Sequence, residues 1–180
     1  QMSGFVTNPM EHAEASKIAI YGVASYSWNP EKYDSEKTWK DAIKNIMPAS
    51  AEELEFFAAH NSDLGANGHR YRRDESVALQ PVAQSFTDSY IKGEKYNEND
   101  YAALQETFGR MAESGDILLT DAENTPLVKE MKPWLTQFKL LGETGEEVLA
   151  MAKAYENGNQ ELFMRKYKHV KALQQQMFQI

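Results

Sequence analysis

The chain has 180 residues, of which 42% are hydrophobic and 11% aromatic, a composition typical of a folded domain rather than a disordered one. Its formal net charge of -8 argues against nucleic acid and anionic membranes as partners, because both require a dense basic face. The absence of cysteine excludes disulfides, thiolate metal sites and cysteine nucleophiles, and no apolar run approaches the roughly 20 residues that span a bilayer.

The beginning of the chain has the pattern of a strand that turns directly into a helix. Residues 4–7 (GFVT) favour a short buried strand, and Asn8, Pro9 and Glu11 then supply an N-cap, a proline at the first helical position and an early glutamate. Asn8 therefore has two interpretations: it caps the helix, or its amide points from the strand end toward a polar ligand. Because Gln1 already lies in this strand pattern, we expect the chain to be cut from a longer polypeptide.

The next part of the chain predicts three short helices. The first covers residues 9–26, and the second begins at Asp34 or Ser35 and ends at Pro48. Residues 50–53 form a capping box that starts the third helix. The side chains expected on the inner faces of the second and third helices are Trp39, Ile43, Ile46, Leu54, Phe57 and Ala58.

A loop over residues 61–73 carries a concentrated group of basic side chains. We call this group the basic cluster; it comprises His69, Arg70, Arg72 and Arg73. Arginine matches carboxylates and phosphates, so the basic cluster can form an interaction patch for an acidic partner. The alternative is ion pairing with the chain's own 27 acidic residues.

The second half of the chain predicts four more helices. Pro81 either opens or kinks the fourth, the fifth covers residues 101–119, and the seventh extends from Phe163 to the end. The sixth covers residues 125–157, and Pro133 can divide off its first turn. Its expected apolar stripe comprises Leu135, Phe138, Leu141, Val148, Leu149 and Ala152. The side chains expected in solvent on the seventh helix are Lys166, Lys168 and Lys171.

These elements predict an all-α fold, a mostly antiparallel bundle of about six to seven helices with a short strand at its N-terminus. Paired glutamates invite a glycosidase interpretation, but we interpret them as surface acids of helices; the pairs are Glu11 and Glu14, Glu52 and Glu53, and Glu146 and Glu147. The histidines lack the spacing of metal ligands, so we expect neither a metal nor a cofactor; they are His12, His60, His69 and His169.

Three runs resemble the bacterial β-N-acetylglucosaminidases of glycoside hydrolase family 84: SGFVTNPMEHAEASKIAIYGVASYSWNP, FFAAHNSDL and KALQQQMF. This family is related to the protein O-GlcNAc hydrolases, and some members are labelled hyaluronidases. The resemblance covers essentially the whole chain and is most specific in its first 30 residues. It implies that residues 1–30 are the last strand and helix of a catalytic (β/α)8 barrel, and that residues 31–180 are the helical bundle domain that follows it.

The resemblance also implies a chemistry. The family removes terminal β-linked N-acetylglucosamine with retention, by a substrate-assisted route in which the 2-acetamido oxygen attacks the anomeric carbon. Asn8 matches the family asparagine that binds a sugar hydroxyl, which leaves capping of the helix to Thr7 or water. The family's consecutive catalytic aspartates do not occur in this sequence. We therefore expect no catalytic residue here and no glycosidase activity from residues 1–180 alone.

Two functions remain as hypotheses. The first is a helical accessory domain that supports the barrel of a secreted or periplasmic bacterial enzyme acting on N-acetylglucosamine-bearing glycoproteins or glycans. The alternative is an interaction module that forms a homodimer or docks a glycoprotein through the basic cluster.

Overall fold

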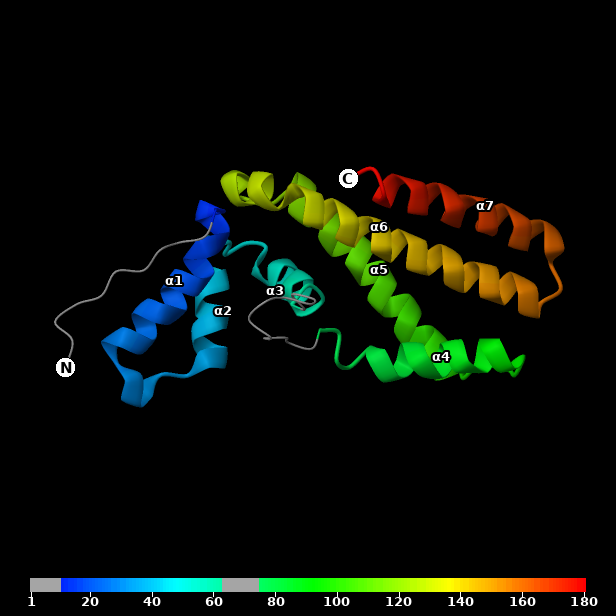
Figure 1. The fold of residues 1–180 in the computed structure, drawn as a ribbon, viewed down its shortest axis with the longest axis horizontal. Helices are drawn as coiled ribbons and strands as arrows, with labels where there is room; N and C mark the ends of the chain where they lie inside the picture. The colour runs from blue at the N-terminus through cyan, green and yellow to red at the C-terminus, as the bar shows by residue number, and fades with distance from the viewer. Residues whose placement is uncertain (1–10, 63–74) are drawn as a thin grey trace.

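The structure, a computed structural model, describes residues 11–62 and 75–180. Within these ranges the chain forms seven α-helices, one 3-10 helix and no strand (Figure 1). The elements are α1 (Ala13–Trp28), η1 (Pro30–Lys32), α2 (Ser35–Ile46), α3 (Ala51–Ala59), α4 (Gln80–Lys92), α5 (Glu98–Thr120), α6 (Thr125–Glu156) and α7 (Gln160–Met177). The all-α prediction is thus confirmed, whereas the strand predicted over residues 4–7 lies outside the described residues.

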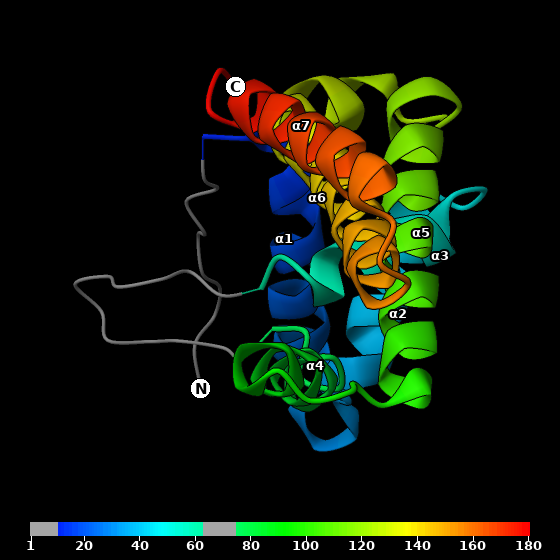
Figure 2. The same ribbon diagram turned by 90° about the vertical axis from the view of Figure 1, so that its right-hand side faces the viewer.

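Helix α6 is the central element of the bundle. It is 32 residues long; α5 packs along its length, α7 along its later part and α1 near its beginning (Figure 1). Short connections make α5, α6 and α7 consecutive antiparallel neighbours. Helices α1 and α2 pack against each other at the end of the molecule opposite the turn between α6 and α7 (Figure 1). Helix α4 is viewed nearly end-on beside α5 in Figure 2. The mostly antiparallel bundle is therefore confirmed, with α4 as the helix that crosses its neighbour.

The core is divided into two clusters of buried side chains. The larger joins α2, α3, α5 and α6, and its largest members are Ile43, Met47, Leu54, Phe57, Met111, Leu118, Leu127, Leu135 and Phe138. The smaller lies where α4 and α5 meet the last turns of α6; it comprises Phe86, Tyr96, Leu104, Leu149 and Ala152. Both clusters use α6, which explains why the amphipathic pattern of this helix extends over so many turns.

Several local predictions are settled by the helix boundaries. Asp34 caps α2, with its carboxylate accepting a hydrogen bond from the backbone N–H of Lys37 at 2.9 Å. Pro81 opens α4 rather than kinking it. Pro133 lies inside α6 without dividing it, and the buried side chains on either side, Leu127 and Leu135, hold both parts of the helix against the same core.

Two other local predictions are wrong. The side chain of Ser50 makes no capping bond to α3; its hydroxyl donates instead to Glu123 Oε2 at 3.3 Å, so the capping box does not form. Leu141 is 41% exposed and not part of the buried stripe of α6. Both errors have a cause outside the local sequence. Glu123 binds the hydroxyl of Ser50, and α5 approaches α6 so closely at Gly142 that Leu141 points outward.

Candidate functional site at the start of helix α1

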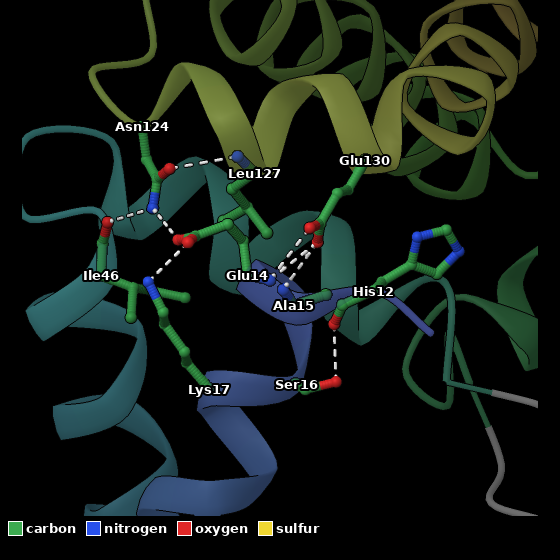
Figure 3. A network of polar contacts seen from close by, with 9 residues as sticks. All are labelled: His12, Glu14, Ala15, Ser16, Lys17, Ile46, Asn124, Leu127 and Glu130. Atoms are coloured by element: carbon green, nitrogen blue, oxygen red, sulfur yellow. Dashed lines mark hydrogen bonds and ion pairs between the residues drawn. The ribbon is translucent and has the colours of Figure 1, made fainter. Parts of the chain in front are cut away.

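The predicted site residues all lie outside residues 11–62 and 75–180, which are the residues that the structure describes. Asn8 and the basic cluster, His69, Arg70, Arg72 and Arg73, fall outside the described residues, so they stay predictions. The described residues that follow Asn8 begin at Glu11 and lead directly into α1. The structure therefore shows how the helix that follows Asn8 is held. We call this place the N-terminal junction and define it by His12, Glu14, Ala15, Ser16, Asn124 and Glu130 (Figure 3).

Helix α1 begins at Ala13, four residues later than the predicted start at Pro9. His12 occupies the N-cap position with an extended backbone, and its side chain makes no capping bond. The cap position of α1 is therefore His12 rather than Asn8, and the other interpretation of Asn8, as a ligand of a polar group, stays a prediction. The carbonyl of His12 accepts hydrogen bonds from the backbone N–H of Ser16 at 2.9 Å and from its hydroxyl at 2.6 Å, which closes the first turn.

The cap of α1 comes from Glu130, a residue of α6. Its Oε2 accepts hydrogen bonds from the backbone N–H groups of Glu14 at 2.9 Å and Ala15 at 3.1 Å, and its Oε1 lies 3.1 Å from the N–H of Glu14 (Figure 3). These N–H groups have no acceptor within their own helix, and the positive end of the helix dipole favours a carboxylate there. The N–H of Glu14 accordingly holds the pKa of Glu130 below its ordinary value.

Asn124 joins three helix ends at the same junction. Its Oδ1 caps α6 by accepting from the N–H of Leu127 at 3.1 Å, and its amide donates to the carbonyl of Ile46, the last residue of α2, at 3.0 Å. The same amide lies 3.4 Å from Glu14 Oε2, whose partner oxygen accepts from Lys17 Nζ at 2.6 Å. The beginning of α1, the end of α2 and the beginning of α6 are thus fixed to one side chain.

Replacing Asn124 by alanine is expected to reduce the free energy of unfolding by about 1–2 kcal/mol, because a cap is lost and the carbonyl of Ile46 loses its partner. Serine at this position keeps a capping oxygen but no amide, so the Asn124→Ser variant should lie between wild type and Asn124→Ala. Urea denaturation measures all three stabilities. An Asn124→Ala protein as stable as wild type would contradict this role.

A contact between two aromatic rings also joins α6 to the residues at the start of α1. The imidazole of His12 and the indole of Trp134 meet edge to face, with their ring centroids 5.6 Å apart. Trp134 lies one helical turn after Glu130, so both side chains project from the same side of α6 toward the start of α1. Residues 12–15 are therefore held by two consecutive turns of the central helix.

Two other polar groups tie α6 to its neighbours. Lys166 Nζ donates to Glu147 Oε1 at 2.8 Å, and His169 Nδ1 lies 3.3 Å from Glu147 Oε2, so the expectation that Lys166 is solvated is wrong. Burial opposes ionisation of Glu147, but the hydrogen bond from Lys166 holds its pKa below the ordinary value.

The hydroxyl of Tyr96 donates to Glu156 Oε2 at 2.8 Å, and burial together with this bond raises the pKa of Tyr96 to about 12. Both groups stabilise packing.

Within residues 11–62 and 75–180, no set of three histidine, aspartate or glutamate side chains is gathered closely enough to ligate a metal ion. No helix in these ranges combines the length and the apolar character needed to cross a bilayer.

Two family models match the chain, and together they cover most of it. The model described as the bacterial GH84 post-catalytic domain matches residues 75–180, and the model described as beta-N-acetylglucosaminidase matches residues 1–59. The solved structure of CpGH84D is similar with a TM-score of 0.82 and 33% identity, over 93% of this chain and 28% of that one. CpGH84B gives a TM-score of 0.80 and 26% identity, over 99% of this chain and 30% of that one.

The present chain therefore spans less than a third of the length of either solved relative. The post-catalytic model includes α4, α5, α6 and α7, and the beta-N-acetylglucosaminidase model includes α1, α2 and α3. The N-terminal junction is one of the places where these two matched regions meet, because Glu14 and Ala15 belong to one and Asn124 and Glu130 to the other. The chain belongs to the bacterial glycoside hydrolase family 84 and contains the post-catalytic helical domain of that family.

Proposed function

We propose that this chain is part of a retaining, substrate-assisted β-N-acetylglucosaminidase that removes terminal β-linked N-acetylglucosamine from glycoproteins or glycans. Family membership carries the proposal, and the beta-N-acetylglucosaminidase match over residues 1–59 supports it. In this proposal, residues 1–30 are the last strand and helix of the catalytic barrel. Residues 31–180 form an accessory domain, which contributes no catalytic group and holds the end of the barrel in place.

The composition and exposure of α1 support its assignment to the barrel. Its charged residues, Glu14 and Lys17, lie near its beginning, and residues 18–28 carry no charge. Yet Tyr26 is 56% exposed and Trp28 is 91% exposed, and Ser16 is the one buried residue of this helix. A helix that is apolar on all sides is normally buried on all sides. The exposed side of α1 therefore suits a second partner, and we assign it to the rest of the barrel.

In this function Asn8 binds a hydroxyl of the N-acetylglucosamine ring. Asn8→Ala in the complete enzyme is expected to lower kcat/KM by roughly 5- to 100-fold, because a buried hydrogen bond to the sugar is lost and its partner is left unsatisfied. The measurement is release of a chromogenic leaving group from a β-N-acetylglucosaminide.

Asn45→Ala is the matched control, since Asn45 is an exposed asparagine whose amide donates to the backbone carbonyl of Asp41. No hydrolysis by the complete wild-type protein would contradict the proposed function as a whole. An active enzyme whose kcat/KM is unchanged by Asn8→Ala would remove Asn8 alone from the sugar site.

A further inference from the structure

We infer that a pocket between the end of α4 and the end of α6 binds one sugar unit of a long glycan. We call it the tyrosine pocket and define it by Tyr90, Glu94, Lys95, Tyr155 and Glu156. Its volume of about 370 Å³ falls within the roughly 300–1,000 Å³ that is usual for small-molecule sites. These residues all belong to the described part of the chain. The choice of a sugar as the ligand also rests on the proposed function, whereas the pocket itself does not.

Two tyrosine rings line the pocket and remain accessible to solvent. Tyr155 is 68% exposed, and its ring centroid lies 5.9 Å from that of the partly exposed Tyr90, at an interplanar angle of 50°. Each ring is supported by a phenylalanine: Tyr90 stacks on the buried Phe86 at 6.3 Å, and Tyr155 contacts Phe163 at 6.0 Å. The face of an aromatic ring carries partial negative charge, so these rings suit the polarised C–H groups of a sugar ring.

The polar groups of the pocket can donate and accept hydrogen bonds, as sugar hydroxyls also do. Glu156 Oε2 accepts from the hydroxyl of Tyr96 at 2.8 Å and lies 3.3 Å from Lys153 Nζ, so this carboxylate is already held in place. Its Oε1 lies 3.8 Å from Lys95 Nζ, beyond hydrogen-bonding distance, and keeps the capacity to accept from a ligand. The exposed ammonium group of Lys95 supplies donors.

The charges beside the pocket favour an uncharged ligand. Lys95 and Lys153 pair with Glu156 at 3.8 and 3.3 Å, and both also pair with Glu98 at 3.4 Å. These two ammonium groups and two carboxylates balance one another, so an ion gains little attraction from them. A neutral ligand with many hydroxyl groups can use the donors and the acceptors together. The balance therefore favours a sugar over an anion or a metal ion.

The tyrosine pocket lies far from the helix that we assign to the catalytic barrel. It is formed at the last turns of α6, whereas Glu130, near the beginning of α6, contacts the start of α1 (Figure 1). At 1.5 Å per residue the two places are roughly 40 Å apart along α6. A single sugar cannot span this distance. The pocket therefore holds a remote part of a long substrate, which raises the effective concentration of that substrate at the barrel.

The first experiment measures KM of the complete enzyme for two substrates. One is a chromogenic β-N-acetylglucosaminide with a single sugar, and the other is a linear oligosaccharide of β-linked N-acetylglucosamine that is longer than the distance between the two places. Tyr155→Ala is expected to raise KM for the oligosaccharide about three- to tenfold, because one stacking surface is lost, and to leave KM for the single sugar unchanged. Since the ring of Tyr155 is mostly exposed, this variant should fold.

The matched control is Tyr167→Ala, which removes an exposed tyrosine of α7 that does not line the pocket. It should leave KM for both substrates unchanged. Tyr155→Phe keeps the ring and should keep most of the affinity for the oligosaccharide. An unchanged KM for the oligosaccharide in Tyr155→Ala, or an equal rise in Tyr167→Ala, would overturn the inference.

The second experiment distinguishes a sugar from a peptide as the ligand. The substrate is a long peptide that carries one N-acetylglucosamine, and Tyr155→Ala should leave its KM unchanged. A rise in KM for this glycopeptide instead of the oligosaccharide would overturn the inference, because the pocket would then bind peptide. If the wild-type enzyme hydrolysed none of these substrates, the proposed function would fail. Calorimetric titration with the oligosaccharide would still test the pocket: binding lost in Tyr155→Ala but kept in Tyr167→Ala supports it, and equal binding overturns it.

Discussion

Gly142→Ala is expected to destabilise the protein by about 3 kcal/mol, at the upper end of the range for adding a methyl group to a filled interior. Gly142 is buried in α6 where this helix crosses α5. A Cβ atom here would collide with the backbone N of Ala112 and would lie 2.6 Å from the carbonyl oxygen of Phe108 and 2.9 Å from Met111 Cβ. Two of these atoms belong to the backbone of α5 and cannot rotate away, so the helices must move apart.

The matched control is Gly109→Ala on α5. A Cβ atom at Gly109 would meet only the carboxylate end of Glu146, 3.3 Å away, and that side chain can turn aside. Because alanine favours a helix over glycine, this variant should be as stable as wild type or up to about 1 kcal/mol more stable. Urea denaturation compares the two. Equal free energies of unfolding for Gly142→Ala and Gly109→Ala would mean that α5 and α6 are not in close contact at Gly142.

The helices themselves were predictable because their signals are local. The period of apolar residues predicts α5 and α7, and Asp34 and Pro81 mark helix starts by rules that involve only neighbouring residues. The face of α6 was less predictable. Spacing alone favours Leu141, but α5 approaches α6 so closely that Gly142 takes the buried position and Leu141 points outward.

The candidate site shows the same division between local and distant signals. Asn8 was assigned by a motif that resembles a known family, and it lies outside the described residues. The role of Glu130 has no local signal, because a lone glutamate on a long helix has the pattern of a surface acid. Only the fold brings Glu130 to the start of α1. A sequence rule assigns the capping of α1 and α3 to nearby residues. Instead, Glu130 caps α1 from 115 positions away, and Glu123 binds Ala49 and Ser50, directly before α3, from 74 and 73 positions away.

Phe138→Ala is expected to cost about 3–5 kcal/mol, the range for removing a buried aromatic side chain. Phe138 is 2% exposed, and its ring packs edge to face on Phe57 with centroids 5.2 Å apart and on Phe56 at 6.0 Å. These rings join α6 to α3, which otherwise packs mainly on α5 and α2. The ring of Phe138 also lies 6.3 Å from that of His60, whose pKa burial lowers below its ordinary value. Loss of the ring should therefore raise the pKa of His60 as water enters.

Leu141→Ala is the control for this change, because Leu141 lies one turn further along the same helix and is 41% exposed. Its side chain removes little apolar surface from water, so the expected cost is below about 1 kcal/mol. Urea denaturation gives the two stabilities, and an NMR titration gives the pKa of His60. If both variants lost the same stability, the stripe predicted from spacing would be correct and Leu141 would be a core residue. A large loss for Phe138→Ala alone, with a raised pKa of His60, places the contact between α3 and α6 at Phe138.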